Sequence, residues 1–153
     1  MKNLKLFVFG IPFILCCTFG SAQLNRINEQ DLNKPRLFQN LPSDVQVTPE
    51  ELTNLLTHEV GEMVNINLSP VFQFQGRVVS TASKYENTIQ SIVIALANYN
   101  GARLTFSKLT HPGQPTTYTG RIISFQHGDL YELAYRDNQY YFVKKKFYDL
   151  VNE

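Results

Sequence analysis

Residues 120–143, GRIISFQHGDLYELAYRDNQYYFV, decide the fold because apolar and polar residues alternate along them between two turn signals. Alternation with a period of two is typical of a half-buried β-strand. His127-Gly128 and Asp137-Asn138 are each a pair that favours a two-residue hairpin turn. The stretch therefore predicts three antiparallel strands, at about 116–126, 129–136 and 139–146.

The two turns predict a common register for these strands. The second turn places Tyr135 opposite Tyr140, and the first places Leu133 opposite Ile122 and Gly120 opposite Tyr135. Both turns bring large apolar side chains to one face of the three strands. That face consists of Ile122, Tyr131, Leu133, Tyr135, Tyr140 and Phe142.

The opposite face of the same strands is also partly apolar. Its apolar members are Ile123, Phe125, Leu130, Tyr141 and Val143. A sheet that is apolar on both sides needs two covers. Either the sheet curls into a barrel with a helix outside, or one face contacts a partner. The candidate interaction face carries Arg121, Phe125, Glu132, Tyr141 and Lys145.

Further strands are expected before residue 116. The runs dense in Val, Ile, Phe and Thr are 63–68, 71–80, 88–97 and 102–110. Short connections favour antiparallel neighbours, and a three-residue loop at 99–101 would pair Leu96 with Leu104. The expected fold is mainly β, an antiparallel meander of six or seven strands forming a curled sheet or small barrel, with one N-terminal α-helix.

The helix is predicted to begin at Thr48. Thr48 is a helix N-cap, Pro49 suits the first helical position, and Glu51 completes a capping box. Gly61 is a plausible stop, which would place Met63 just past the helix. Apolar residues follow at helical spacing on one face: Leu52, Leu55, Leu56, Val60 and Met63.

Residues 1–22 have the pattern of a secretory signal peptide. Lys2 and Lys5 precede an apolar run at 6–19, and small residues at 20–22 suit cleavage. The run is shorter than the roughly 20 residues that a spanning helix needs. We therefore expect export to the periplasm or the exterior and no membrane span. A lipoprotein is less favoured, because Leu15, before Cys16, is not the small residue that acylation requires.

The remaining chain is expected to form a docking arm and one domain. Residues 23–47 are predicted as a linker or docking arm, in which Leu37, Phe38 and Leu41 can dock as an apolar plug. Residues 48–153 are predicted as the helix and antiparallel β domain. Loss of residues 1–22 removes both cysteines, which excludes disulfides, thiol nucleophiles and zinc held by cysteine.

The charge balance argues against nucleic acid as a partner. Loss of residues 1–22 also removes two lysines and changes the net charge from +1 to −1. The run Lys144-Lys145-Lys146 lies among aromatic residues, but consecutive strand residues alternate between faces. These lysines are predicted to protect an edge strand from unwanted pairing.

No set of residues in the sequence points to an enzyme. His58 begins a zinc-like helix motif, but Glu62 stands where the second histidine must be. No phosphate loop, dinucleotide fingerprint or Gly-x-Ser-x-Gly elbow is present. We expect no catalytic residue, cofactor or metal. A hydrolase would need His58, His111 or His127 beside an acid in one cleft.

One sequence pattern resembles a known family. It consists of Phe74-x-Gly76-x-Val78, Ser91-x-Val93, Gly120-x-Ile122 and Gly128-x-x-Tyr131-x-Leu133. Over about 72–133 this resembles the N-terminal propeptide of reprolysin-like zinc metallopeptidases. The likeness departs from the family in lacking the inhibitory cysteine and a His-Glu-x-x-His domain. It implies a non-catalytic module that contacts another protein, with no functional residue assigned.

These observations predict an exported, non-enzymatic β-rich module that binds another protein. An accessory or inhibitory, prodomain-like role follows from the resemblance, and the partner would be another exported or envelope protein. The alternative is a small β-barrel that binds an apolar ligand. The alternative requires a lumen of at least ~300 Å³.

Overall fold

The computed structural model describes residues 33–146. The predicted signal peptide, residues 1–22, lies outside this range. The elements in chain order are β1 (Asp44–Val47), α1 (Pro49–Leu55), β2 (Met63–Ser69), β3 (Phe72–Lys84), β4 (Ile89–Leu96), β5 (Arg103–Leu109), β6 (Thr117–Ser124), β7 (Asp129–Arg136) and β8 (Gln139–Lys146).

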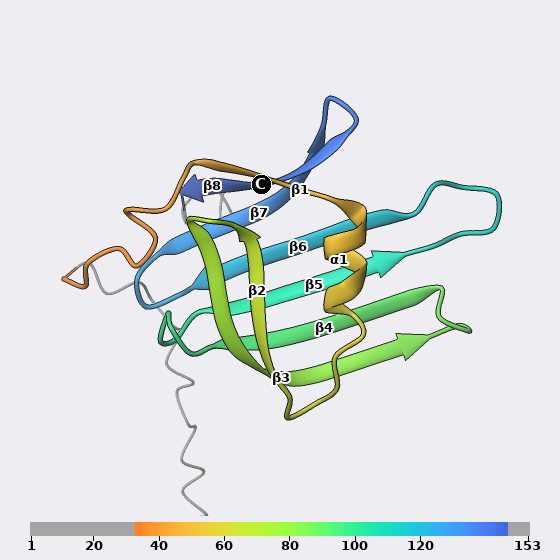
Figure 1. The fold of residues 1–153 in the computed structure, drawn as a ribbon, viewed down its shortest axis with the longest axis horizontal. Helices are drawn as coiled ribbons and strands as arrows, with labels where there is room; N and C mark the ends of the chain where they lie inside the picture. Colours follow the sequence, from red (N-terminus) through yellow and green to blue (C-terminus); the bar gives the residue numbers. More distant parts are fainter. Residues whose placement is uncertain (1–32, 147–153) are drawn as a thin grey trace, which may run out of the picture.

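All eight strands form one antiparallel sheet in the order β1-β8-β7-β6-β5-β4-β3-β2. The sheet curls until its edge strands β1 and β2 approach each other, giving a nearly closed, barrel-like shape (Figure 1). The prediction of a mainly β, antiparallel fold is confirmed, but the count of six or seven strands is wrong. The missed strand is β1, whose four residues are too short for a recognisable pattern; it pairs Val45 with Phe142.

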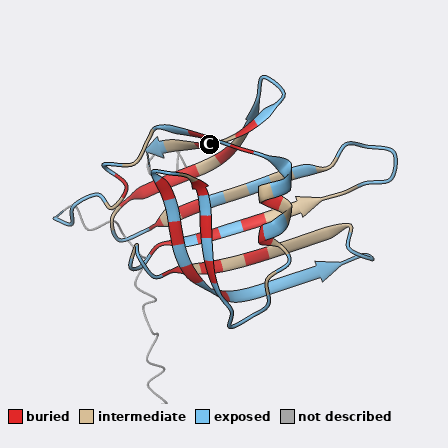
Figure 2. Cartoon of the chain, viewed as in Figure 1, coloured by how far each residue is buried: buried red, intermediate tan, exposed pale blue. Residues whose placement is uncertain are grey.

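The core lies on the inner face of the curled sheet. The helix α1, β2 and the first part of β3 cross in front of strands β4–β7 and cover that face (Figures 1 and 2). Leu52 and Leu55 of α1 join the core, so the helix packs against the inner face. The largest fully buried side chains of this core are Tyr131, Phe38, Phe72, Phe74, Phe106, Phe142, Leu52, Ile92, Ile94, Leu104 and Ile122. Leu130, on the opposite face beside Ile123, is also fully buried.

Strand β3 bends, so that its first part lies with β2 over the inner face and its last part continues the sheet beside β4. Its first part pairs with β2, and a bulge between Val78 and Ser80 precedes the part that pairs with β4 alone. Gly76 lies where β3 presses on β4, and a Cβ atom there would stand 2.6 Å from the carbonyl oxygen of Ala95. This close approach requires glycine.

The observed registers confirm one predicted turn and correct two others. Asp137 and Asn138 have φ values of 50° and 62°, and Tyr135 pairs with Tyr140 as predicted. The preceding loop, however, has four residues, 125–128, so that Ile122 pairs with Tyr131. At residues 97–101 a five-residue loop likewise pairs Ile94 with Leu104. Both shifts equal two residues, which leaves every side chain on its predicted face.

The helix begins as predicted and ends early. The capping box between Thr48 and Glu51 is present. The helix ends at Leu55, so the prediction that it continues towards Gly61 with Val60 on its apolar face is wrong: Val60 is 61% exposed. Met63 begins β2, in agreement with the strand predicted at 63–68. The reason is β-pairing, since the main chain at 61–62 already bonds Val78 of β3.

Of the predicted arm, the structure describes residues 33–47: residues 44–47 are β1, a strand of the sheet, and the residues before them pack against the sheet. Phe38 is fully buried, and its ring contacts those of Tyr99 and Tyr131. The Lys144 ammonium donates to the carbonyl oxygens of Phe38 at 2.7 Å and Leu41 at 2.6 Å. The prediction that the lysines protect an edge strand is therefore wrong for Lys144, because β8 lies between β1 and β7. Within residues 33–146, no helix has the length and apolar character to cross a membrane.

Candidate functional site

Strands β6 and β7 separate near the ends of their hairpins. Their ladder runs from Ser124 opposite Asp129 to Arg121 opposite Glu132. Beyond it, residues 117–120 stay paired with β5, and residues 133–136 stay paired with β8. The tip of the β7–β8 hairpin bends away from β6, so the two hairpins diverge (Figure 1).

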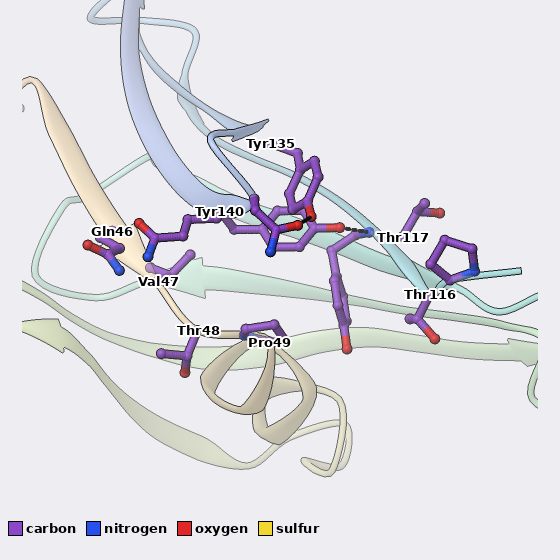
Figure 3. A pocket seen from close by; sticks show the side chains of 12 residues that line it. Gln46, Val47, Thr48, Pro49, Thr116, Thr117, Tyr135 and Tyr140 are labelled. Atoms are coloured by element: carbon purple, nitrogen blue, oxygen red, sulfur yellow. Dashed lines mark hydrogen bonds between the residues drawn. The ribbon is translucent and has the colours of Figure 1, made fainter.

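A cleft of about 620 Å³ lies where the hairpins diverge, within the size range of small-molecule sites. Pro49 at the start of α1 faces Tyr140 and Tyr135 across the cleft, and Thr116 and Thr117 lie at one end (Figure 3). The lining residues are Gln46, Val47, Thr48, Pro49, Pro115, Thr116, Thr117, Tyr118, Tyr135, Asn138, Gln139 and Tyr140.

Three tyrosine rings from three strands form one contiguous aromatic surface. The Tyr118 and Tyr140 rings meet edge to face, 5.3 Å apart with 86° between their planes. Tyr135 lies 4.7 Å from Tyr140 at 47°. Tyr118 also stacks on the buried ring of Phe106 at 5.9 Å. Tyr140 belongs to the core and Tyr118 packs against it, whereas Tyr135, 59% exposed, completes the aromatic wall near the tip of the β7–β8 hairpin.

The hydroxyl groups of these tyrosines are all engaged within the protein. Tyr118 Oη lies 2.9 Å from Thr53 Oγ1, and Tyr135 Oη donates to Asn138 Oδ1 at 2.5 Å. Tyr140 Oη accepts a long hydrogen bond of 3.3 Å from the Tyr118 main-chain N–H. Burial is the main cause that raises the pKa of Tyr140. The rings are thus held in place and offer mainly their faces to a ligand.

The lining of the cleft carries no Asp, Glu, Lys, Arg or His. Apart from the phenols, its polar side chains are the amides of Gln46, Asn138 and Gln139 and the hydroxyls of three threonines. Neutral amides and hydroxyls both donate and accept hydrogen bonds. The arrangement therefore suits an uncharged ligand with apolar and hydrogen-bonding parts.

The predicted interaction face lies on the outer side of β6, β7 and β8. Arg121 Nη2 and Glu132 Oε1 form an ion pair at 2.9 Å on neighbouring strands. They line a 370 Å³ hollow on the outer side of the strand separation. Lys145 is exposed opposite Leu130. Arg121 and Glu132, the last pair of the β6–β7 ladder, flank the separation that forms the cleft.

The other two residues of the predicted face lie near its ends. Tyr141 is half-buried, its ring lies 4.4 Å from the Arg136 guanidinium, and its hydroxyl donates to Gln139. Phe125 is 43% exposed in the β6–β7 loop. The structure thus spreads the five predicted residues along one face and does not gather them into a pocket.

The three histidines lie apart in the structure. His58 Nδ1 lies 2.8 Å from Glu62 Oε1. The hydrogen bond from the Glu59 main-chain N–H is the largest cause that lowers the pKa of the Glu62 carboxyl, and the hydrogen bond with His58 is the second. His127 Nδ1 lies 2.7 Å from the carbonyl oxygen of Pro35, and His111 is in the exposed β5–β6 loop.

His58 has a neighbouring acid, Glu62, and lines a hollow of about 440 Å³ together with Glu59. No described hydroxyl forms a hydrogen bond with the second ring nitrogen of His58, as a nucleophile would. Among residues 33–146, no three His, Cys, Asp or Glu side chains are grouped to hold a metal ion.

The fold and the cleft define an antiparallel β protein with an uncharged, tyrosine-lined hollow between two hairpins. No protein-family model, curated protein or solved structure matches the chain.

Sequence reasoning placed Tyr135 and Tyr140 on one face but did not include Tyr118 or Pro49 in a site. The available signal for Tyr118 was the alternation along 116–126, which puts Tyr118 on the same face as Ile122. Pro49 carries no such signal, because it reaches the cleft only through the position of α1.

Proposed function

We propose that this protein is a non-enzymatic module that binds another protein and that the cleft between the two hairpins is the binding site. The observation that carries the proposal is the wall formed by Tyr118, Tyr135 and Tyr140. Tyrosine is enriched in protein interfaces and among the residues that dominate binding energy. Rings already fixed by packing lose little conformational entropy on binding.

The sequence adds the compartment and the kind of role to this proposal. The pattern of residues 1–22 supports export, so the partner would be another exported or envelope protein. The resemblance to a metallopeptidase propeptide supports an accessory or inhibitory role. The predicted face at Arg121 and Glu132 flanks the same strand separation, and a protein large enough to enter the cleft would reach it.

A matched pair of tyrosine variants tests the proposal. The full chain is used as bait for proteins of the secreted and envelope fractions of its source. Tyr135→Ala alters the cleft, and Tyr141→Ala alters the outer face on the neighbouring strand. We expect a stoichiometric partner whose affinity falls at least about tenfold with Tyr135→Ala and stays unchanged with Tyr141→Ala.

Two results would contradict this assignment. Loss of binding with Tyr141→Ala alone would move the site to the predicted outer face. Recovery of no stoichiometric partner by the unaltered chain would count against a protein-binding function altogether.

A second candidate function is the binding of a small uncharged molecule in the same cleft. The predicted alternative placed an apolar ligand in a barrel lumen, but aromatic rings fill the inner face: Phe72 packs 4.6 Å from Phe74 and 4.8 Å from Tyr131. The cleft volume of about 620 Å³ favours a ligand at the surface instead. Native mass spectrometry of protein purified from its source would detect such a ligand, and Tyr135→Ala should release it.

A further inference from the structure

We propose that the cleft takes an uncharged, extended peptide segment of the partner, which adds its main chain to the open edge of β6. This inference rests on the proposed function and states how the partner is recognised. It follows from the strand edges in the cleft, from the hydrogen bond that closes one of them, and from the charge of the lining.

The first support is the open edge of β6. Residues 117–120 pair with β5 on one side, and their ladder to β7 is absent among the described residues. Main-chain groups alternate between the two edges of a strand. The bond from the Tyr118 N–H to Tyr140 shows that this N–H points into the cleft. An open strand edge is a template for pairing with another chain.

The second support is the group that now closes this edge. The Tyr140 hydroxyl occupies the position that a carbonyl oxygen of a neighbouring strand would take beside Tyr118. At 3.3 Å its bond is longer than the usual 2.9–3.0 Å for an N–H donor. A peptide carbonyl can replace this hydroxyl without breaking any pairing of β6 with β5.

The opposite wall of the cleft is also a strand edge. Arg136 and Gln139 flank the two-residue turn and pair with each other, so the main chain of Tyr135 points to the other side, towards β6. The strands still pair at Arg121 and Glu132, so the cleft is a wedge that opens at the hairpin tips. An extended segment entering there would continue the sheet into the gap.

The third support is the lining. A strand added to β6 would direct alternate side chains towards the rings of Tyr118, Tyr135 and Tyr140. With no charged group in the lining, a charged peptide side chain would lose water without gaining a partner. A small molecule would have no need of the main-chain edges, so these edges favour a peptide.

The test begins with a displayed library of random linear 12-residue peptides, selected on the immobilised full chain. Enriched peptides should be uncharged at their centre and should bind at least tenfold more weakly to Tyr135→Ala in fluorescence anisotropy titrations. N-methylation of their amides, one at a time, should weaken binding at least tenfold at the alternate positions that face β6, and at the intervening positions only where the peptide also reaches the edge of β7.

Tyr140→Phe gives the sharper distinction. It keeps the ring and removes the hydroxyl that competes for the Tyr118 N–H. Peptide binding should therefore strengthen, by about two- to tenfold for one net hydrogen bond. Tyr85→Phe, which removes the hydroxyl of an exposed tyrosine in the β3–β4 loop outside the cleft lining, should leave the affinity unchanged.

Failure of this inference can be told apart from failure of the proposed function. No enriched peptide, binding insensitive to N-methylation, or weaker binding by Tyr140→Phe would overturn main-chain recognition. If Tyr135→Ala still lost the captured partner, the cleft would remain the binding site. Self-association of the full chain that Tyr135→Ala abolishes would show that a second copy fills the cleft, and would overturn a separate partner.

Discussion

Replacing Phe38 with alanine tests whether the arm before β1 is part of the core. The side chain of Phe38 is fully buried. Its ring centroid lies 5.4 Å from that of Tyr99, 5.5 Å from Tyr131 and 6.4 Å from Phe74. Truncating a buried phenylalanine to alanine costs about 3–5 kcal/mol. Because three aromatic rings surround this side chain, we expect the decrease in unfolding free energy to lie in the upper half of that range.

Urea unfolding followed by far-UV circular dichroism measures this decrease. We expect a lower transition midpoint with an unchanged slope, since the rest of the fold still unfolds as one unit. Phe125→Ala is the matched control, because Phe125 is 43% exposed, and it should cost less than about 1 kcal/mol. A loss below about 1 kcal/mol for Phe38→Ala would refute the reasoning, because the arm would then contribute little to the stability of the sheet.

Three further changes test other contacts by the same unfolding measurement. Lys144→Met leaves the carbonyl oxygens of Phe38 and Leu41 without their donor and should lower the unfolding free energy by about 1–3 kcal/mol. Lys145→Met, at an exposed site, should change it by less than about 0.5 kcal/mol, and equal effects of the two variants would contradict the role of Lys144. Gly76→Ala would bring a Cβ atom within 2.6 Å of the Ala95 carbonyl oxygen and should cost about 1–3 kcal/mol; a neutral result would mean that β3 and β4 separate easily. Burial raises the pKa of Tyr131, so above pH about 10 the unfolded chain loses its phenolic proton before the folded chain does, and unfolding free energy should fall with pH by up to about 1.4 kcal/mol per unit. Tyr131→Phe should make that decline shallower, and an unchanged decline would show that Tyr131 ionises freely in the fold.

Alternation along the chain predicted the faces of the strands correctly because it is a local property. Ile122, Tyr131 and Phe142 lie on the inner face as the pattern indicates. The loop at 125–128 shows the limit of such reasoning. A shift of two residues preserves each face, so the hydrophobic match could not distinguish Leu133 from Tyr131 as the partner of Ile122.

Helical spacing failed at Val60 for a different reason. The pattern continued the helix, but the main chain at 61–62 pairs with Val78, which is distant in sequence. The binding role predicted for Arg121, Phe125, Glu132, Tyr141 and Lys145 stays a prediction. Those residues share the outer side of the sheet, and the cleft lies on the inner side of the same strands.

The sequence by itself determined the class of fold, the start of the helix and the composition of the two sheet faces. These depend on residue spacing, capping groups and turn residues, which act over a few positions. The tertiary structure alone decided the place of β1, the end of the helix and the separation of β6 from β7. That separation brings Tyr118, Tyr135 and Pro49 to one cleft. The sequence could not predict it, because it depends on how whole hairpins and α1 pack, and no local pattern records which strand edges remain open.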